Sequence, residues 1–124
     1  VTIYNRTRDK ALALAEEFDG RAADFTDRAA LDADIVINTT SVGMSPRIDE
    51  SPLPPDALTP GMTVLETIYN PLQTKLLADA ARVGCATITG LDMFVSQAAL
   101  QFETWFNIPA PRDLMRQIVH QHLG

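Results

Sequence analysis

Apolar and polar positions alternate with two different periods along the chain and predict strands and helices that follow one another in turn. Short apolar runs predict strands at residues 1–4, 21–23, 34–39, 62–69 and 85–89. Apolar positions at helical spacing predict helices at residues 9–18, 74–83, 91–106 and 112–123, with helical turns near 26–31 and 55–58. Strands separated by helices predict an α/β fold with a mostly parallel sheet that is covered on both faces.

Signals for helix ends and loops support this order of elements. The apolar stripe predicted for the first helix consists of Ala11, Leu12, Ala15 and Phe18. Gly84 suits the left-handed position after the helix at 74–83. The strand at 34–39 is rich in β-branched residues, as expected when both faces of a strand are buried. Residues 41–60 predict a long irregular loop, and such loops are more often functional than idle.

Composition and charge exclude several classes of function. The chain has 124 residues, the size of one domain, and a net charge of −6, which argues against non-specific binding to nucleic acid. No apolar run approaches the roughly 20 residues that cross a membrane, and no signal-peptide pattern is present. Cys85 is the single cysteine, so an internal disulfide is excluded and a cytoplasmic setting is expected. Because Cys85 lies in an apolar stretch, we expect it to be a small buried residue.

A basic cluster follows the first predicted strand. Arg6, Arg8 and Lys10 stand where the strand at 1–4 gives way to a helix. In open α/β sheets the carboxyl end of a strand is where ligands bind, and an arginine there suits the 2′-phosphate of NADP. The alternative is that these three residues form an ordinary solvated helix start. The cluster by itself favours neither interpretation.

The glycine positions bear on the same question. A dinucleotide-binding sheet needs a Gly-rich turn after its first strand, but no G-x-G-x-x-G sequence occurs in this chain. If residues 1–4 form the second strand of such a sheet, the turn precedes residue 1. We therefore expect a truncated Rossmann-like, doubly wound sheet that lacks its first strand and Gly-rich loop, followed by C-terminal helices. The open sheet edge predicts self-association, such as a homodimer.

Four short sequences in a fixed order carry a resemblance to a known family. They are Asn5-Arg6-Thr7 with Lys10, Asn38-Thr39-Thr40-Ser41-Val42-Gly43-Met44, Tyr69-Asn70-Pro71 with Thr74, and Gly90-Leu91-Asp92-Met93 with Gln97. Together they resemble the C-terminal NADP-binding domain of the shikimate dehydrogenase family over essentially all of residues 1–124. The sequence around 94–111 looks closest to the type fused to a 3-dehydroquinate dehydratase. The resemblance implies NADPH-dependent reduction of 3-dehydroshikimate to shikimate, a step of aromatic amino-acid biosynthesis, in the full-length protein.

The resemblance also implies roles for individual residues. Those expected to hold the 2′-phosphate of NADP are Asn5, Arg6, Thr7 and Lys10. Those expected near the rest of the cofactor are Thr40, Ser41, Val42, Gly90 and Met93. Tyr69 and Gln97 are expected to bind the substrate, shikimate or 3-dehydroshikimate. The chemistry agrees, because arginine binds phosphate with two parallel hydrogen bonds and a glutamine amide suits a polyhydroxylated ring.

Each of these roles has a plainer structural alternative. Lys10 and Gln97 could be surface residues, and Gly43 could serve a turn rather than an approach of the backbone to the cofactor. Tyr69 could be a partly buried aromatic residue whose hydroxyl is satisfied by backbone, and Met93 could fill the core. Thr67 departs from the aliphatic or methionine side chain that relatives often carry near the nicotinamide.

The resemblance places no catalytic residue in this chain. The family's catalytic lysine and aspartate belong to an N-terminal substrate-binding domain that these residues do not include, so the isolated chain is expected to be inactive. No metal site is expected, because His120 and His122 lie two residues apart on a helix and face different directions. Two rivals remain, a quinate or quinate/shikimate dehydrogenase and a non-catalytic module for nucleotide binding or assembly.

Overall fold

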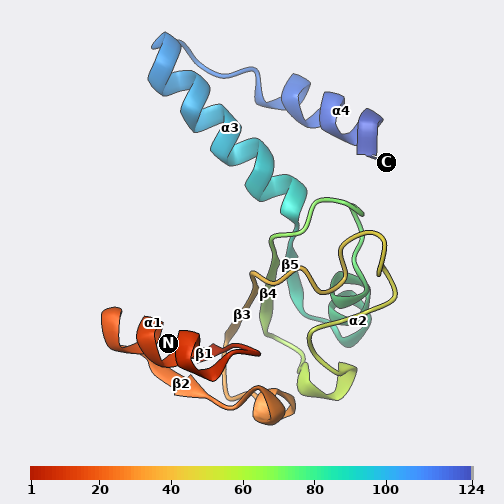
Figure 1. Cartoon of the computed structure of the whole chain (residues 1–124). Coiled ribbons are helices and arrows are strands. Elements are labelled where there is room, and N and C mark those ends of the chain that lie inside the picture. Colours follow the sequence, from red (N-terminus) through yellow and green to blue (C-terminus); the bar gives the residue numbers. More distant parts are fainter. Residues whose placement is uncertain (124) are drawn as a thin grey trace. The chain divides into compact units, whose positions relative to one another are not determined.

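The computed structural model describes residues 1–123 and confirms the predicted α/β class (Figure 1). The chain divides into two compact units, one comprising Val1–Asp32 and the other beginning at Ala33. All pairs of neighbouring strands in the two units are parallel among the described residues. None of the described helices is both long and apolar enough to cross a membrane.

Unit 1 is a βαβ unit. It consists of β1 (Thr2–Tyr4), α1 (Arg8–Glu17) and β2 (Arg21–Ala23), followed by a short 3-10 helix, η1 (Phe25–Ala29). β1 and β2 pair in parallel with Ile3 opposite Ala22. Of the predicted helical stripe, Ala11 and Ala15 are buried, whereas Leu12 and Phe18 are exposed. A sheet of two strands covers only a narrow strip of a helix, which explains why half of the stripe stays outside.

Unit 2 contains a three-stranded parallel sheet in the order β3-β4-β5. Its strands are β3 (Ile35–Asn38), β4 (Thr63–Glu66) and β5 (Ala86–Ile88). The long loop after β3 contains the 3-10 helix η2 (Pro55–Ala57), and α2 (Lys75–Val83) connects β4 to β5. Two further helices, α3 (Gly90–Phe106) and α4 (Arg112–Leu123), follow β5 and pack against each other (Figure 1).

The two faces of the β3-β4-β5 sheet differ. One face packs against α2, and its buried core includes Val64, Leu76, Leu77 and Ala80. On the other face, Ile35 is 62% exposed and Ile37 is 57% exposed. The prediction that the strand at 34–39 is covered on both faces is therefore wrong for this unit, because within it only one face carries a helix.

The residues predicted to begin and end the helix at 74–83 do so in unit 2. The Thr74 hydroxyl accepts a hydrogen bond from the Leu77 amide at the start of α2. Gly84 ends that helix in the left-handed conformation, with φ of 95°.

Cys85 is half-buried, whereas the sequence predicted a fully buried residue. Its thiol donates a hydrogen bond to the Thr59 carbonyl at 3.4 Å. β5 forms an edge of the sheet, which leaves the residues around it partly open to solvent.

Candidate functional site

The basic cluster of unit 1 lies between β1 and α1, as the sequence predicts. Arg6, Thr7 and Lys10 are exposed, and Thr7 is the N-cap residue of α1 without a capping bond from its side chain. The Asn5 carboxamide oxygen accepts a hydrogen bond from the Thr7 amide at 2.8 Å and so shapes the turn. A helix N-terminus carries partial positive charge. The turn and the start of α1 therefore combine three exposed cations, Arg6, Arg8 and Lys10, with a hydroxyl and a helix N-terminus, a donor set that fits a phosphate group.

In unit 2, the loop after β3 carries the predicted residues Thr40, Ser41 and Val42. Asn38, at the end of β3, is buried, and its carboxamide oxygen accepts hydrogen bonds from the Thr40 amide at 3.0 Å and the Thr40 hydroxyl at 2.8 Å. The Thr40 hydroxyl in turn accepts from the Val42 amide at 3.1 Å. Successive side chain to backbone bonds of this kind hold a loop in one shape.

Gly43 follows on this loop with φ of 97°, a conformation that favours glycine. A Cβ atom added there would also lie 3.0 Å from the Glu50 carbonyl oxygen. Of the two interpretations of Gly43, the structure therefore favours a turn glycine.

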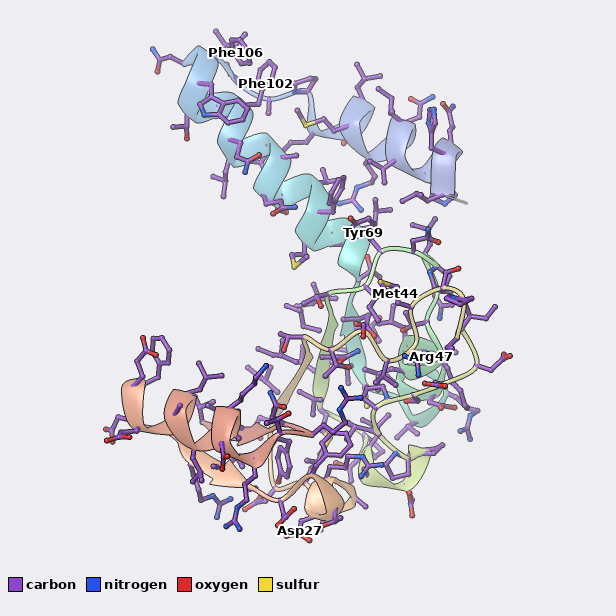
Figure 2. All side chains as sticks on the ribbon, viewed as in Figure 1. Asp27, Met44, Arg47, Tyr69, Phe102 and Phe106 are labelled. Carbon is purple, nitrogen blue, oxygen red and sulfur yellow. The ribbon has the colours of Figure 1, made fainter. Side chains whose placement is uncertain are left out.

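The loop after β4 carries the predicted residue Tyr69 and runs beside the loop after β3. The Thr67 amide and hydroxyl both donate to the Asn38 carbonyl oxygen, at 3.1 and 2.8 Å. Further along, the Ser45 amide donates to the Asn70 carbonyl at 3.4 Å. Figure 2 labels Met44 and Tyr69, one on each of these loops. Thr67, the departure from the family pattern, thus joins the two strands at their carboxyl ends.

Tyr69 lies against the first turns of α3. Its ring stacks on Phe94 with centroids 4.5 Å apart, and 38% of the residue is exposed. Gly90, the first residue of α3, is buried against the backbone of Ile68 and Tyr69 so closely that a Cβ atom would overlap the Ile68 carbonyl. Gly90 therefore lets the helix start against the loop that carries Tyr69, a role that the sequence did not predict.

Met93 and Gln97 lie one turn apart on α3. Met93 is half-buried and Gln97 is exposed. The start of this helix is strongly fixed, because Thr89 and Asp92 form a reciprocal capping box. The Asp92 carboxylate also accepts a hydrogen bond from the Arg116 guanidinium of α4 at 2.6 Å. The hydrogen bond from Thr89, supported by Arg116, holds the pKa of Asp92 below its usual value of 3.8.

A buried carboxylate that sequence reasoning missed lies beneath the two loops of unit 2. Glu66 ends β4 and is fully buried. Both carboxylate oxygens accept from the Asn38 amide nitrogen at 3.0 Å, and the Thr74 hydroxyl donates to one of them at 3.1 Å. The Ile68 amide donates to the other oxygen at 3.0 Å. A signal existed in the sequence, because strand alternation places Glu66 on the same buried face as Val64 and Ile68.

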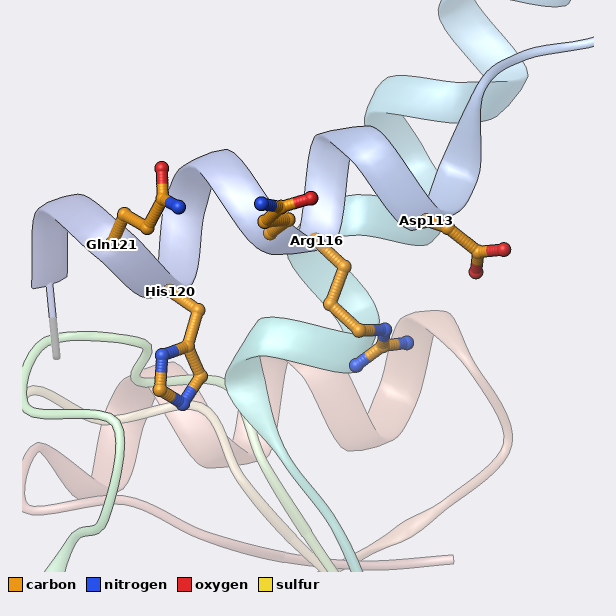
Figure 3. Close-up of a pocket in the computed structure, with 5 residues that line it drawn as sticks. Asp113, Arg116, His120 and Gln121 are labelled. Atoms are coloured by element: carbon orange, nitrogen blue, oxygen red, sulfur yellow. The ribbon is translucent and has the colours of Figure 1, made fainter.

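The described residues also include an open pocket on α4, and none of the predicted site residues lines it. It is lined by Asp113, Arg116, Gln117, His120 and Gln121 (Figure 3). These side chains come from one helix, and Arg116 is already paired with Asp92. No group of His, Cys, Asp and Glu able to hold a metal ion occurs among residues 1–123. His122 contacts the Ile118 carbonyl of its own helix through Nδ1 at 2.8 Å.

The fold and these loops define a class of protein. Parallel strands joined by helices, with polar and aromatic residues on the loops at the carboxyl ends of the strands, are typical of Rossmann-like nucleotide-binding folds. The comparison with known proteins narrows the class. A family model described as the shikimate 5′-dehydrogenase C-terminal domain matches residues 90–120.

Curated relatives match the whole chain. The NADP(+) shikimate dehydrogenase of Moorella thermoacetica is 41% identical over 134 residues, which cover 100% of this chain and 45% of the relative. The chloroplastic bifunctional 3-dehydroquinate dehydratase/shikimate dehydrogenase of Arabidopsis thaliana is 41% identical over 125 residues, 98% of this chain and 21% of the relative. The equal identities do not separate the fused type from the unfused type.

Solved structures agree with the sequence matches. The shikimate 5-dehydrogenase of Thermus thermophilus, in complex with NADP(H) and shikimate, has a TM-score of 0.87 and 34% identity, covering 98% of this chain and 45% of that one. The quinate dehydrogenase of Corynebacterium glutamicum, in complex with NAD, has a TM-score of 0.82 and 26% identity, covering 94% and 44%. The chain is thus similar over its whole length to shikimate dehydrogenases, and its residues 90–120 match the model of their C-terminal domain. It spans about half the length of the Moorella relative.

Proposed function

We propose that this chain is the NADP-binding part of a shikimate dehydrogenase that reduces 3-dehydroshikimate to shikimate. The observation that carries the proposal is the exposed group of Arg6, Thr7 and Lys10 around the N-terminus of α1. When bound, NADPH supplies the hydride for such a reduction. Arg6 would hold the 2′-phosphate that distinguishes NADP from NAD, and Asn5 would keep the turn in shape through its bond to Thr7.

The loops of unit 2 would serve the other end of the cofactor and the substrate. Thr40, Ser41 and Val42 would contact the cofactor, with Gly90 and Met93 near the nicotinamide. Tyr69 and Gln97 would bind the substrate. The exposed amide of Gln97 and the partly exposed ring of Tyr69 support this assignment, because both side chains can reach a ligand.

We further propose that the chain on its own does not turn over substrate, because the proton chemistry at the substrate carbonyl requires a positioned acid or base. The family resemblance assigns that chemistry to a lysine and an aspartate of a separate substrate-binding domain. Of the two lysines in this sequence, Lys75 is held by Asp79 at 3.0 Å on α2. Lys10 belongs to the proposed phosphate site.

Titration calorimetry with NADP+, NAD+ and 2′,5′-ADP tests the cofactor assignment. We expect the wild-type chain to bind 2′,5′-ADP and Arg6→Ala to weaken this binding by roughly tenfold or more, since a charge-assisted bond to phosphate is lost. Arg8→Ala removes the same charge two residues away and is the matched control. An equal loss in both variants would contradict a specific phosphate contact by Arg6.

Two rivals give different results in related measurements. A quinate dehydrogenase, favoured by the similarity to the Corynebacterium structure, would prefer quinate over shikimate in the full-length protein. A non-catalytic module that serves assembly alone would bind neither NADP+ nor 2′,5′-ADP. One that serves nucleotide binding would bind nucleotide, but the full-length protein would turn over neither shikimate nor quinate. NADPH-dependent turnover of 3-dehydroshikimate by the isolated chain would contradict the proposed inactivity.

The exposed apolar face of the β3-β4-β5 sheet supports a further part of the proposal, namely that the isolated chain self-associates as a homodimer. Ile35, Ile37 and Ile88 are all exposed, and the register sets Ile37, Leu65 and Ile88 in one row across the three strands. A contiguous apolar surface of this kind favours association in water.

A further inference from the structure

The loops after β3 and β4 share one buried anchor, the carboxylate of Glu66. Asn38 connects this carboxylate to the loop after β3, because its amide nitrogen donates to Glu66 and its carboxamide oxygen accepts from Thr40. The Ile68 amide connects the carboxylate to the loop after β4. Thus the backbones of both loops are hydrogen-bonded, directly or through Asn38, to a single side chain that is itself fully buried.

A third connection runs to α2. The Thr74 hydroxyl donates to Glu66 and accepts from the Leu77 amide, so the N-cap of α2 also touches the carboxylate. The partial positive charge of a helix N-terminus favours a carboxylate at this place. The donors that reach Glu66 come from β3, from the loop after β4 and from the start of α2.

A buried carboxylate is costly unless its oxygens are hydrogen-bonded, and an apolar side chain would fill this position at lower cost. Only an acceptor with two oxygens can satisfy donors from three segments at once. An apolar residue would leave the Asn38 amide, the Ile68 amide and the Thr74 hydroxyl without this partner. The arrangement therefore indicates a function in holding the segments together with defined geometry, beyond filling the core.

We propose that Glu66 is a positioning residue that holds the loops carrying Thr40, Val42 and Tyr69 in the shape that receives the nicotinamide half of NADP. Glu66 is fully buried, so it acts through Asn38, Ile68 and Thr74 rather than by touching the ligand. The proposal rests on the proposed function. It adds that binding of the nicotinamide half depends on this carboxylate, whereas binding of the 2′-phosphate end does not.

The test compares two ligands on the same variants. NADP+ has both halves of the cofactor, whereas 2′,5′-ADP carries the 2′-phosphate and lacks the nicotinamide. For Glu66→Gln in the 124-residue chain we expect NADP+ binding to weaken by about fivefold or more and 2′,5′-ADP binding to change by less than about twofold, because preorganisation of the loops is lost at one end only. Hydrogen exchange at the amides of Thr40, Val42 and Ile68 is expected to accelerate in parallel.

Asp79→Asn is the matched control, since it also removes a buried hydrogen-bonded carboxylate of unit 2, but on α2, where the partners are Lys75 and Arg82. It should lower stability and leave the ratio of the two affinities unchanged. If Glu66→Gln does not fold, Thr74→Val removes the bond from the Thr74 hydroxyl to Glu66, together with the cap to the Leu77 amide. It is expected to lower the affinity for NADP+ relative to that for 2′,5′-ADP, and Thr74→Ser is expected to restore it.

The outcomes separate the two proposals. A wild-type chain that binds neither ligand overturns the proposed function, and the role of Glu66 with it. Binding of 2′,5′-ADP to all variants, together with an unchanged ratio in folded Glu66→Gln, overturns the positioning role alone. An equal change of the ratio in Asp79→Asn also overturns it, because a general loss of stability would then explain the result.

Discussion

Gly90 shows how much a single position can decide in this chain. A Cβ atom at residue 90 would collide with the backbone carbonyl of Ile68 and approach the Tyr69 amide. These atoms belong to backbone, which cannot move aside as the end of a flexible side chain can. Gly90 is thus required for α3 to begin against the loop that carries Tyr69. This structural role does not depend on a contact between Gly90 and a ligand.

We expect Gly90→Ala to lower the free energy of unfolding by about 1–3 kcal/mol, the usual cost of forcing extra volume into a packed site. Urea unfolding followed by fluorescence of Trp105 measures the change. Ser96→Ala, an exposed position on the same helix, is the control and should change stability by less than about 0.5 kcal/mol. A Gly90→Ala variant as stable as wild type would contradict the close approach described here.

The residue scale also shows why some site residues were predictable and others were not. Arg6, Tyr69 and Gln97 could be proposed from their residue types, their places after a strand or on a helix, and the family resemblance. The role of Glu66 could not be predicted in this way, because its partners Asn38 and Thr74 lie 28 and 8 residues away in the sequence. Only the parallel register, which sets Asn38 opposite Glu66, shows that this carboxylate has partners.

At the scale of elements, Asp92 joins two helices. Its carboxylate caps α3 through the Thr89 hydroxyl and amide, at 2.6 and 3.1 Å, and binds Arg116 of α4. Asp79 similarly joins Lys75 and Arg82 along α2. Burial alone would raise the pKa of Asp79, but the hydrogen bonds from Lys75 and Arg82 outweigh it and lower the pKa below 3.8.

These lowered pKa values predict how stability depends on pH. In the folded chain Asp79 and Asp92 hold their protons more weakly than in the unfolded chain, so the unfolded state binds more protons in acid. Their stabilising contribution is therefore complete above pH 3.8 and is lost as the pH falls through the lower folded-state values.

Urea unfolding between about pH 6 and about pH 2 measures this dependence. We expect the double variant Asp79→Asn/Asp92→Asn to be less stable than wild type at neutral pH and to show a shallower loss of stability below pH 3.8. Asp113→Asn replaces an exposed aspartate of α4 and should keep the slope of the wild type. Equal slopes in all three proteins would contradict the assignment to Asp79 and Asp92.

On the scale of the whole molecule, the apolar sheet face of unit 2 opposite α2 bears on association between chains. An α/β sheet of parallel strands is normally covered on both faces. Here α2 covers one face of β3-β4-β5, while Ile35, Ile37 and Ile88 remain exposed on the other. Contact between such an apolar surface and water is unfavourable, and association would bury the surface and remove this cost.

We expect the 124-residue chain to associate at high concentration and Ile37→Lys to reduce this association, because the charge would have to be buried in the contact. Sedimentation velocity over a range of concentrations measures it. Gln73→Lys introduces the same charge at an exposed position outside this face and is the control. A wild-type chain that stays monomeric at high concentration would contradict the proposal.

The sequence by itself determined the α/β class, the order of elements and the helix ends of unit 2. It did so because these features depend on local periods and on nearby signals such as Thr74 and Gly84 around α2. Its four short motifs also predicted the resemblance to shikimate dehydrogenases that the relatives confirm. All of this information lies within short stretches of chain.

The tertiary structure alone decided which residues meet. Three features depend on how distant segments pack. They are the contacts of Glu66 with three segments, the requirement for glycine at position 90, and the exposed face around Ile37. These are consequences of packing between segments that are distant in the sequence. No local period encodes them, because a one-residue shift in register would exchange the two faces of the strand.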